Sequence, residues 1–367
     1  MKIFFCGGGT AGHVSPALAM AEQIRLKYQD AEIFFIGREG GDENRAIIRE
    51  GYPLFTLSVE GISRSLSPKN VIATLKAVAA VSKARKILQK NGADMVIGTG
   101  GYVSWAPLRA AAQLGIPRMI HEANAYPGLV TRLLARKCSC VMLGFAEACK
   151  HIQGAKAVYT VGNPTKEGFG RHTRTEARRA LGIPDSKMLI VSFGGSLGAK
   201  SINDAVIGFM RSIKDRRYLI SHIHAVGRRY WDSVLSESKE LCEGARGLKI
   251  VPYIDNMPLW LCAADLVISR SGAMTLAELQ ASRVPAILIP SPNVTGDHQL
   301  KNAEAARERG SAILIRDEEL TPGSLGDAVL SLYRDRRRLN AMGEAYGNGF
   351  TEAADDFIDV FEKYYPF

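Results

Sequence analysis

The sequence predicts an α/β protein made of two Rossmann-like, doubly wound domains that face a cleft. Apolar runs of strand length alternate with helical patterns of roughly ten or more residues, which indicates parallel sheets with helices on both faces. A strand, a glycine-rich turn and a helix follow one another twice, about half a chain apart, and 367 residues favour two domains. Ligands bind beyond the carboxyl ends of the strands in such sheets, so we expect the active site in the cleft.

The first glycine-rich turn lies in Met1–His13, where a short apolar strand runs into a turn that carries Thr10 and His13. A helix is expected over Pro16–Lys27. Glycines let the backbone turn tightly and bring bare N–H groups close to a ligand, and the positive end of the helix dipole points at the same place. The turn therefore suits a negatively charged or hydroxyl-rich ligand. Its glycines are Gly7, Gly8, Gly9 and Gly12.

The second turn lies in Met188–Leu197, where an apolar run leads into Gly194, Gly195 and Ser196, and a helix is expected over Gly198–Ile213. This order of strand, glycine pair, hydroxyl and helix is typical of phosphate-binding sites. The other expected strands are Glu32–Gly37, Met95–Gly98, Arg118–His121 and Cys140–Leu143 in the first half, and Ile220–Ala225, Leu248–Val251, Leu266–Ser269 and Ala286–Pro290 in the second.

Composition excludes several classes of protein. The chain is 46% hydrophobic with a mean hydropathy of -0.03, and no apolar run approaches the roughly 18 residues of a membrane-spanning helix. Only four apolar residues follow Lys2 before the first glycines, too few for a secretory signal, so we expect a cytosolic protein. The six cysteines are scattered and form no C-x-x-C pair, which favours free buried thiols over zinc ligands or disulfides.

The net positive charge of the chain is concentrated in its first half. Residues 1–163 hold 20 Lys and Arg against 11 Asp and Glu, whereas residues 164–367 hold 27 against 26. No nucleic-acid-binding motif accompanies this excess, so an anionic membrane surface or acceptor is the better interpretation. Pro68–Lys90 has the spacing of an amphipathic helix with lysines beside its apolar residues. It suits either a bilayer interface or an ordinary helix packed on its own sheet.

The most specific stretch is Tyr253–Asn302, in which the elements of a nucleotide-sugar site follow in order. A helix that begins near Gly272 offers free N–H groups to a diphosphate, and Glu278 can accept hydrogen bonds from both hydroxyls of a ribose. The backbone at Ile254 offers the N–H and C=O that match a uracil edge, and the Gln299 amide suits sugar hydroxyls. The order and spacing of these elements predict a site for a UDP-sugar.

Taken together, these motifs resemble those of a known family, the MurG glycosyltransferases of peptidoglycan synthesis. The resemblance implies the two-domain GT-B fold and the transfer of N-acetylglucosamine from UDP-GlcNAc to the C4 hydroxyl of the undecaprenyl-diphosphate-linked muramoyl pentapeptide, lipid I. The product is lipid II, formed with inversion. The matching segments are Gly7–Pro16, Gly98–Tyr102, His121–Asn124 with Gly128, Gly162–Pro164, Gly194–Ser196 with Gly198, Tyr253–Met257, Ser269–Glu278 and Asp297–Ala303.

The resemblance also implies a division of labour. Residues 1–162 would form an acceptor and membrane-facing domain, residues 163–344 would bind UDP-GlcNAc, and a helix over about 345–367 would pack back on the first domain. His13 and Asn124 would lie near the reacting sugar, while Lys166 stands where the family usually has a phosphate-binding Arg. The implied donor contacts are Thr10, Ala11, Gly12, Asn124, Ser196, Ile254, Ala273, Met274, Thr275, Leu276, Ala277, Glu278 and Gln299.

The expected chemistry needs no metal and no cofactor, because the sequence lacks the Asp-x-Asp pair of metal-dependent glycosyltransferases. Helix N-termini and Lys166 would stabilise the departing diphosphate. His13 is the leading candidate for the general base, since imidazole titrates near neutral pH. A helix-capping or sugar-binding role for His13 remains open, and Glu122 is a competing base.

Three other functions remain open from the sequence. Another UDP-sugar-dependent lipid glycosyltransferase would keep the same motifs, and a UDP-GlcNAc 2-epimerase would share the fold and the donor. A nucleotide-binding scaffold on the membrane would need neither His13 nor Asn124. An NAD-dependent oxidoreductase is disfavoured because neither glycine-rich turn completes G-x-G-x-x-G. For the preferred function we expect a peripheral protein on the cytoplasmic face of the cell membrane.

Overall fold

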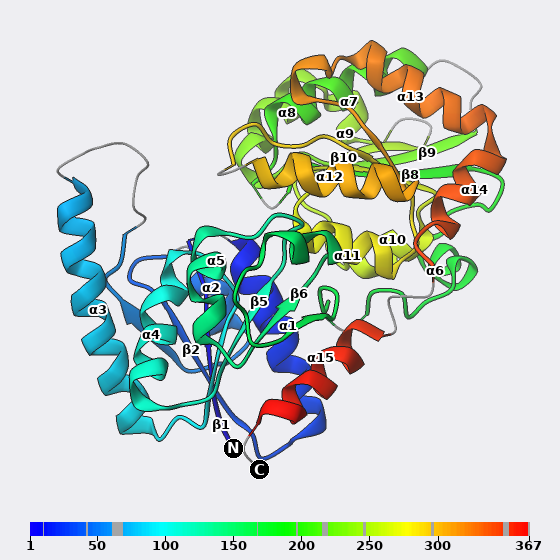
Figure 1. Cartoon of the computed structure of the whole chain (residues 1–367). Helices are drawn as coiled ribbons and strands as arrows, with labels where there is room; N and C mark the ends of the chain where they lie inside the picture. Colours follow the sequence, from blue (N-terminus) through cyan, green and yellow to red (C-terminus); the bar gives the residue numbers. More distant parts are fainter. Residues whose placement is uncertain are drawn as a thin grey trace. The chain divides into compact units, whose positions relative to one another are not determined.

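A computed structural model of the 367-residue chain divides into two compact units (Figure 1). The first unit contains Met1–Lys166 and Thr351–Phe367, and the second contains Glu167–Phe350. The structure describes residues 1–9, 11–41, 43–60, 69–166, 168–195, 197–214, 219–244, 247–294, 297–347 and 352–365. The first unit thus extends four residues beyond the expected boundary at 162, and the assignment of acceptor and donor to the two parts stays a prediction.

The first unit is built on a parallel seven-stranded sheet in the order β3-β2-β1-β4-β5-β6-β7. Its central strands are fully enclosed, as expected for apolar runs covered by helices on both faces. The strands are β1 (Lys2–Cys6), β2 (Glu32–Arg38), β3 (Leu54–Leu57), β4 (Met95–Gly98), β5 (Arg118–Glu122), β6 (Cys140–Leu143) and β7 (Val158–Thr160). Sequence patterns missed β3 and β7, which are only four and three residues long.

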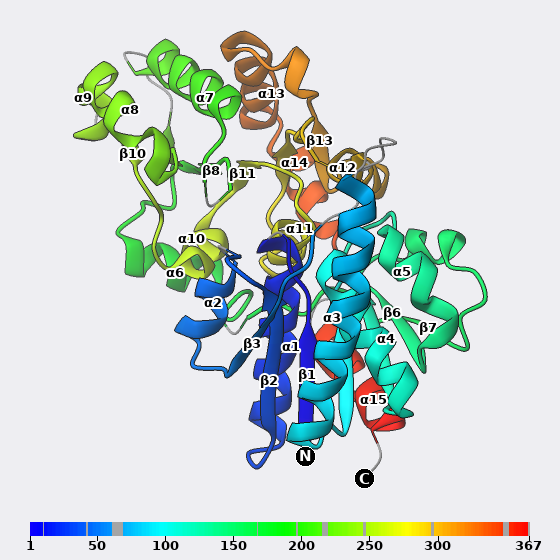
Figure 2. The same cartoon turned by 90° about the vertical axis from the view of Figure 1, so that its left-hand side faces the viewer.

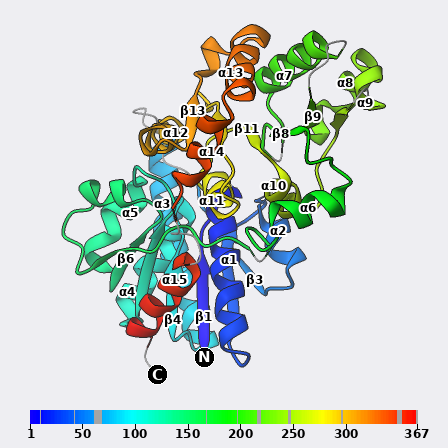
Figure 3. The same ribbon diagram turned by 90° about the vertical axis from the view of Figure 1, so that its right-hand side faces the viewer.

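Helices cover both faces of this sheet. The last helix of the chain packs beside the first one (Figure 3). Its Phe357 and Phe361 are fully buried in the core of the first unit. The long basic helix α3 packs on α4 (Figure 2). The α-helices are α1 (Ala11–Lys27), α2 (Asn44–Arg49), α3 (Lys69–Asn91), α4 (Trp105–Leu114), α5 (Leu129–Leu134) and α15 (Glu352–Tyr364).

The second unit has a parallel six-stranded sheet in the order β10-β9-β8-β11-β12-β13. Its strands are β8 (Met188–Phe193), β9 (Ile220–Ala225), β10 (Leu248–Val251), β11 (Leu266–Ser269), β12 (Ala286–Leu288) and β13 (Ala312–Leu314). Its α-helices are α6 (Arg174–Leu181), α7 (Lys200–Ile213), α8 (Trp231–Glu237), α9 (Lys239–Cys242), α10 (Met257–Ala263), α11 (Ala273–Ala281), α12 (His298–Arg309), α13 (Pro322–Arg334) and α14 (Arg336–Glu344).

Two parallel sheets with alternating helices confirm the predicted α/β class. In each sheet a central strand pairs with a neighbour on either side: β1 lies between β2 and β4, and β8 lies between β9 and β11. The chain reverses its winding direction at these strands, and a crevice opens at such a point. Both glycine-rich turns follow these central strands, which is why they can face a ligand.

The first helix differs from the prediction. It begins at Ala11 rather than at Pro16, so the proline lies inside the helix. Pro16 is the sixth residue of this helix, past the first turn, so the helix lacks the one hydrogen bond that an N–H at this position would donate. His13 consequently belongs to the first turn of α1 and not to a loop before it.

Candidate functional site

The first glycine-rich turn is packed against the segment after β4. Gly9 has a φ of 88°, and a Cβ atom there would lie 2.8 Å from the Tyr102 ring. The Thr99 hydroxyl donates to the backbone carbonyl of His13 at 2.6 Å, which ties the start of α1 to the end of β4. Only glycine permits this close approach, because a side chain would collide with Tyr102. Two motifs that are 90 residues apart in the sequence thus form one corner of the first unit.

His13 lies half-buried in this corner against bare backbone. Cβ atoms at Gly100 and Gly101 would lie 2.8 Å from its Cδ2 and 3.0 Å from its Nδ1, and both glycines have positive φ. The glycines after Thr99 therefore make room for the imidazole ring. Gly12 is exposed beside it, Ala11 begins α1, and the predicted contact Thr10 lies outside the described residues.

A carboxylate that the sequence did not single out completes the corner. The Gly9 N–H donates to Glu43 Oε1 at 2.7 Å, and a Cβ at Gly8 would lie 3.1 Å from the same oxygen. Glu43 comes from the connection between β2 and α2 and is half-buried. In the sequence it sits in a polar turn with no motif around it, so no signal indicated that it would reach the glycine-rich turn.

Glu122 and Asn124 form a saturated hydrogen-bond cluster after β5. Glu122 Oε1 accepts from the backbone N–H and the side-chain amide of Asn124 at 3.2 and 3.1 Å. Its Oε2 accepts from the Gly128 N–H at 2.9 Å and from the Thr131 hydroxyl at 2.7 Å. Because Glu122 is only 4% exposed and both oxygens are occupied, this geometry favours a structural role over that of a base. The Glu122 carboxylate instead orients Asn124.

Lys166 belongs to the first unit, where its Nζ forms an exposed ion pair with Glu50. A surface pair of this kind contributes little to stability and is readily exchanged for another anion. The predicted phosphate contact of Lys166 therefore stays a prediction.

The second glycine-rich turn requires glycine for a similar steric reason. A Cβ at Gly194 would lie 2.3 Å from the Ala199 backbone nitrogen, and one at Gly198, where φ is 78°, would lie 2.0 Å from the Val226 carbonyl oxygen. The turn is therefore folded tightly onto the segment after β9. Its Leu197 is 73% exposed, whereas the predicted contact Ser196 lies outside the described residues.

Helix α11 presents its N-terminus without a side-chain cap. Gly272 occupies the N-cap position in extended conformation, so the first N–H groups of the helix lack an intramolecular acceptor from the cap. The preceding Ser271 is fully buried, and its hydroxyl donates to the Gln299 carbonyl at 2.7 Å. Of the predicted contacts in α11, Ala273, Leu276 and Ala277 are buried and Met274 and Thr275 are half-buried. This arrangement is suited to an anion.

Glu278 lies farther along α11 and is half-buried. Burial raises the pKa of its carboxyl group from about 4.5 to about 7. Within the described parts of the chain, no hydrogen bond or ion pair reaches this carboxylate. A half-buried carboxylate without partners costs stability, and such a group is a candidate for binding a ligand.

Gln299 and Ile254 are also fixed by the fold of the second unit. Gln299 Oε1 accepts from the Ser291 N–H at 2.9 Å, so the Nε2 group is the end of the amide that can donate to another group. The Ile254 side chain is buried and holds its backbone in place, while the neighbouring Tyr253 is 46% exposed under the Arg228 guanidinium. The structure thus brings Gln299 to Ser271 at the start of α11, as the motif order suggested.

Arg270 was missed by the sequence analysis but supports this region. Its guanidinium donates to Asp317 at 2.5 Å, to the Ile289 carbonyl at 3.2 Å and to the Ser201 hydroxyl at 3.1 Å. These bonds connect the end of β11 with α7 and with the segment after β12. The residues just before α11 are therefore held from three directions.

The exposed side of α3 is basic. The helix contains no acidic residue, and its described half exposes Lys83, Arg85, Lys86 and Lys90. Val78 in the same helix is 61% exposed. The predicted apolar residues Val71, Ile72 and Leu75 lie where side chains are outside the described part. No helix in the described residues is both long and apolar enough to cross a bilayer.

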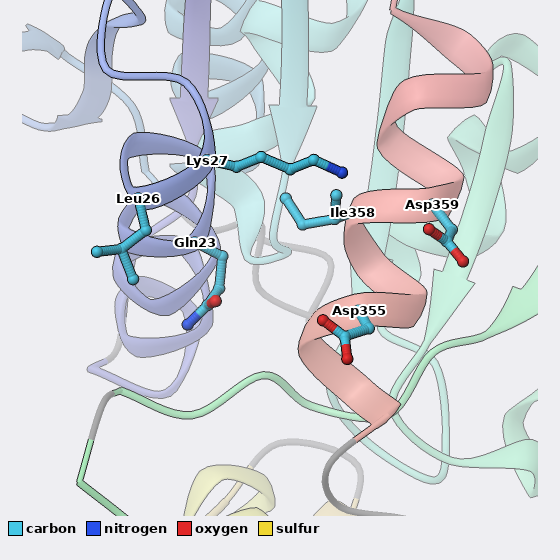
Figure 4. A pocket seen from close by; sticks show the side chains of 6 residues that line it. All are labelled: Gln23, Leu26, Lys27, Asp355, Ile358 and Asp359. Atoms are coloured by element: carbon cyan, nitrogen blue, oxygen red, sulfur yellow. The ribbon is translucent and has the colours of Figure 1, made fainter.

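A groove lies between the ends of α1 and α15 (Figure 4). It contains none of the predicted site residues and lies at the opposite end of α1 from His13. It is lined by Gln23, Leu26, Lys27, Asp355, Ile358 and Asp359. The groove is therefore separate from the candidate site.

Comparison with known proteins gives relatives along the whole chain. Residues 3–143 match the N-terminal domain of glycosyltransferase family 28, and residues 189–357 match its C-terminal domain. A UDP-N-acetylglucosamine–N-acetylmuramyl-(pentapeptide) pyrophosphoryl-undecaprenol N-acetylglucosamine transferase from Desulforudis audaxviator is 39% identical over 99% of this chain and 98% of its own length. The protein of the same name from Halothermothrix orenii is 42% identical over 94% of each chain.

Solved structures with the same fold include transferases and epimerases. The crystal structure of Acinetobacter baumannii MurG aligns with a TM-score of 0.76 at 27% identity and covers 99% of both chains. A UDP-GlcNAc 2-epimerase from Neisseria meningitidis aligns with a TM-score of 0.65 at 13% identity, covering 99% of this chain and 100% of its own. At 13% identity, the likeness to the epimerase shows the fold alone.

Proposed function

Because the chain belongs to glycosyltransferase family 28, we propose that it transfers N-acetylglucosamine from UDP-GlcNAc to the C4 hydroxyl of the undecaprenyl-diphosphate-linked muramoyl pentapeptide. The product is the β-1,4-linked disaccharide, formed with inversion at the anomeric carbon. The relatives confirm the resemblance to the MurG glycosyltransferases that the motifs indicated.

The observation that carries this proposal is the environment of Glu278. Its carboxylate is half-buried and has no hydrogen-bond or ion-pair partner among the described residues, and it follows an uncapped N-terminus in the same helix. A nucleoside diphosphate satisfies both needs at once, because its phosphates accept from N–H groups and its ribose donates two hydroxyls. The second unit would therefore hold UDP-GlcNAc, with the Ile254 backbone on the uracil and Gln299 on the sugar.

The other donor contacts are proposed on the same basis. Ser196 in the second glycine-rich turn would approach the diphosphate, and the first-turn residues Thr10, Ala11 and Gly12 would approach the donor sugar. Asn124 would lie beside the reacting sugar, where the Glu122 carboxylate fixes its amide at 3.1 Å. Lys166 would exchange Glu50 for a donor phosphate.

In the proposed reaction His13 removes the proton of the acceptor hydroxyl as its oxygen attacks the anomeric carbon. The bond from that carbon to the UDP oxygen breaks, and the electron pair leaves with UDP. Imidazole is a common general base in enzymes, and the position against Gly100 and Gly101 fixes the His13 ring. The N–H groups at the start of α11 stabilise the charge that develops on the leaving diphosphate. We propose that this mechanism needs no metal.

The acceptor is anchored in lipid, so the protein must reach a membrane surface. We propose that it binds reversibly to the anionic cytoplasmic face through the first unit, with the exposed lysines and arginines of α3 as the main contact. Undecaprenyl-linked substrate and enzyme would then meet in the same plane.

The decisive experiment incubates the purified protein with UDP-GlcNAc and a lipid I analogue and identifies the products. Formation of the β-1,4 disaccharide supports the proposal. Conversion of UDP-GlcNAc into UDP-ManNAc without acceptor would instead identify a 2-epimerase. Transfer to a different lipid-linked sugar, with no transfer to the lipid I analogue, would indicate another lipid glycosyltransferase.

A further inference from the structure

The carboxylate of Glu43 sits directly on the first glycine-rich turn. Its Oε1 accepts from the Gly9 N–H at 2.7 Å, a distance typical of a charge-assisted bond. Among the described residues this is the only hydrogen bond of the Glu43 side chain, so no described donor reaches Oε2. One oxygen is thus held by the backbone, and the other is available to a ligand.

This contact changes which ligand the turn can accept. The sequence left two kinds open, a negatively charged group and a hydroxyl-rich one. The Gly9 N–H, one of the donors that an incoming phosphate would use, already bonds a carboxylate. A second anion at the same place would meet the repulsion of a like charge in a half-buried setting. A neutral hydroxyl meets no such repulsion and can donate to Oε2.

The surrounding groups also suit a sugar. The Tyr102 ring lies against Gly9, and its phenol has no partner among the described residues. Burial raises the pKa of this phenol; the Arg38 charge lowers it and the Glu43 charge raises it. The Nε of Arg38 is enclosed and unpaired in the described structure. His13 lies against Gly101, where an added Cβ atom would also collide with the Gly8 carbonyl oxygen. The corner therefore combines a carboxylate, a phenol and an imidazole.

We propose that Glu43 binds a hydroxyl group of the acceptor sugar, so that the first glycine-rich turn receives the sugar end of the acceptor and not its diphosphate. This inference rests on the proposed function, because it names the part of the acceptor that the first unit holds. Glu43 accepts a hydrogen bond and undergoes no covalent change. His13, four residues after Gly9 in the sequence, would then lie beside the bound sugar.

The test compares the Glu43→Gln variant with the wild type in the transfer assay. Glutamine keeps an oxygen for the Gly9 N–H but replaces the free oxygen with an amide that cannot accept. We expect the KM for the lipid I analogue to rise roughly 10-fold to 100-fold, as for a lost bond to a charged group, while the KM for UDP-GlcNAc changes less than about twofold. Glu43→Asp, which keeps the charge but withdraws it from Gly9, should raise the acceptor KM as well.

Glu39→Gln provides the matched control. Glu39 lies in the same connection and is exposed. Its replacement by glutamine removes the same charge, and no described contact joins Glu39 to the turn. Its acceptor KM should equal that of the wild type. Unfolding curves of all variants show whether they fold, and Glu43→Asp carries the test if Glu43→Gln does not.

Binding of inorganic pyrophosphate, measured by calorimetry, tests the opposite reading without any transfer reaction. We expect no gain in pyrophosphate affinity in Glu43→Gln. A pyrophosphate affinity that is about tenfold or more higher in Glu43→Gln, or a lower acceptor KM, would show that the Glu43 charge weakens anion binding at this turn. Either result would overturn the proposal. An unchanged acceptor KM in a folded Glu43→Gln variant would also overturn it. Absence of transfer by the wild type would instead refute the proposed function and leave the pyrophosphate result valid.

Discussion

Replacing Glu278 with glutamine should stabilise the protein and weaken nucleotide binding at the same time. The carboxylate is half-buried and no described residue pairs with it, so its charge is unfavourable in the free protein. In the complex the same charge would accept hydrogen bonds from the ribose hydroxyls. A residue with only a structural role would not change stability and affinity in opposite directions.

The magnitude of the stability effect follows from the pKa. Burial raises the pKa of Glu278 from about 4.5 to about 7, and each unit corresponds to about 1.4 kcal/mol, so ionisation costs up to about 3.5 kcal/mol. The folded state binds the proton more tightly than the unfolded state. Stability from this group is therefore fully present below pH 4.5 and is lost as the pH rises through 7. Glu278→Gln should be neutral near pH 4 and stabilising at pH 8.

The effect on binding has its own pH dependence. At pH 8 the variant should lose about 1–3 kcal/mol of UDP affinity, the range for hydrogen bonds to a charged group. Below pH 7 the wild-type carboxylate must lose a proton before it binds the ribose. The wild-type Kd for UDP should therefore rise about tenfold for each unit by which the pH falls. Between pH 5.5 and 8 the Kd of Glu278→Gln should change only with the ionisation of UDP itself, so the difference between the two proteins should shrink as the pH falls.

Urea unfolding and calorimetric titration with UDP at several pH values measure both quantities. Glu308→Gln is the control, because Glu308 is an exposed carboxylate in the same unit, on α12. UDP should also bind more tightly than ADP to the wild type, since the Ile254 backbone matches uracil. Unchanged UDP affinity in Glu278→Gln, together with a pH-independent wild-type Kd, would refute the ribose assignment.

Three further predictions address the base, the metal and the membrane. His13→Ala should lower kcat by about 10²-fold to 10⁴-fold with the UDP-GlcNAc affinity within a few-fold; near-normal kcat with a raised KM would show a binding role. Transfer activity should persist in EDTA, and loss of activity that Mg²⁺ or Mn²⁺ restores would refute the metal-free mechanism. Lys83→Glu/Lys86→Glu should reduce co-sedimentation with anionic vesicles, since each lysine contributes about 1 kcal/mol at the surface. Folded double variants that bind as the wild type does would exclude this face of α3.

The local code of the sequence determined the class of the fold and the order of the site. Apolar runs followed by glycine-rich turns and helices are short-range patterns, and steric rules for parallel strands fix how such units assemble. The turns at Gly7–Gly9 and Gly194–Gly198 and the motif around Glu278 could therefore be identified without coordinates. Strands β3, β7 and β13 were missed because they are short edge strands with mostly half-buried side chains, whereas the short strands β4, β6 and β11 are fully buried apolar runs.

Only the tertiary structure decided what each polar group does, because that depends on partners far away in the sequence. Glu122 and Glu43 are both carboxylates of the first unit, yet among the described residues the first receives four hydrogen bonds and the second receives one. Arg270 reaches Asp317, 47 positions away, and Glu43 reaches Gly9 across 34. Burial and hydrogen bonding across such separations set charge, pKa and orientation, and no local pattern encodes them.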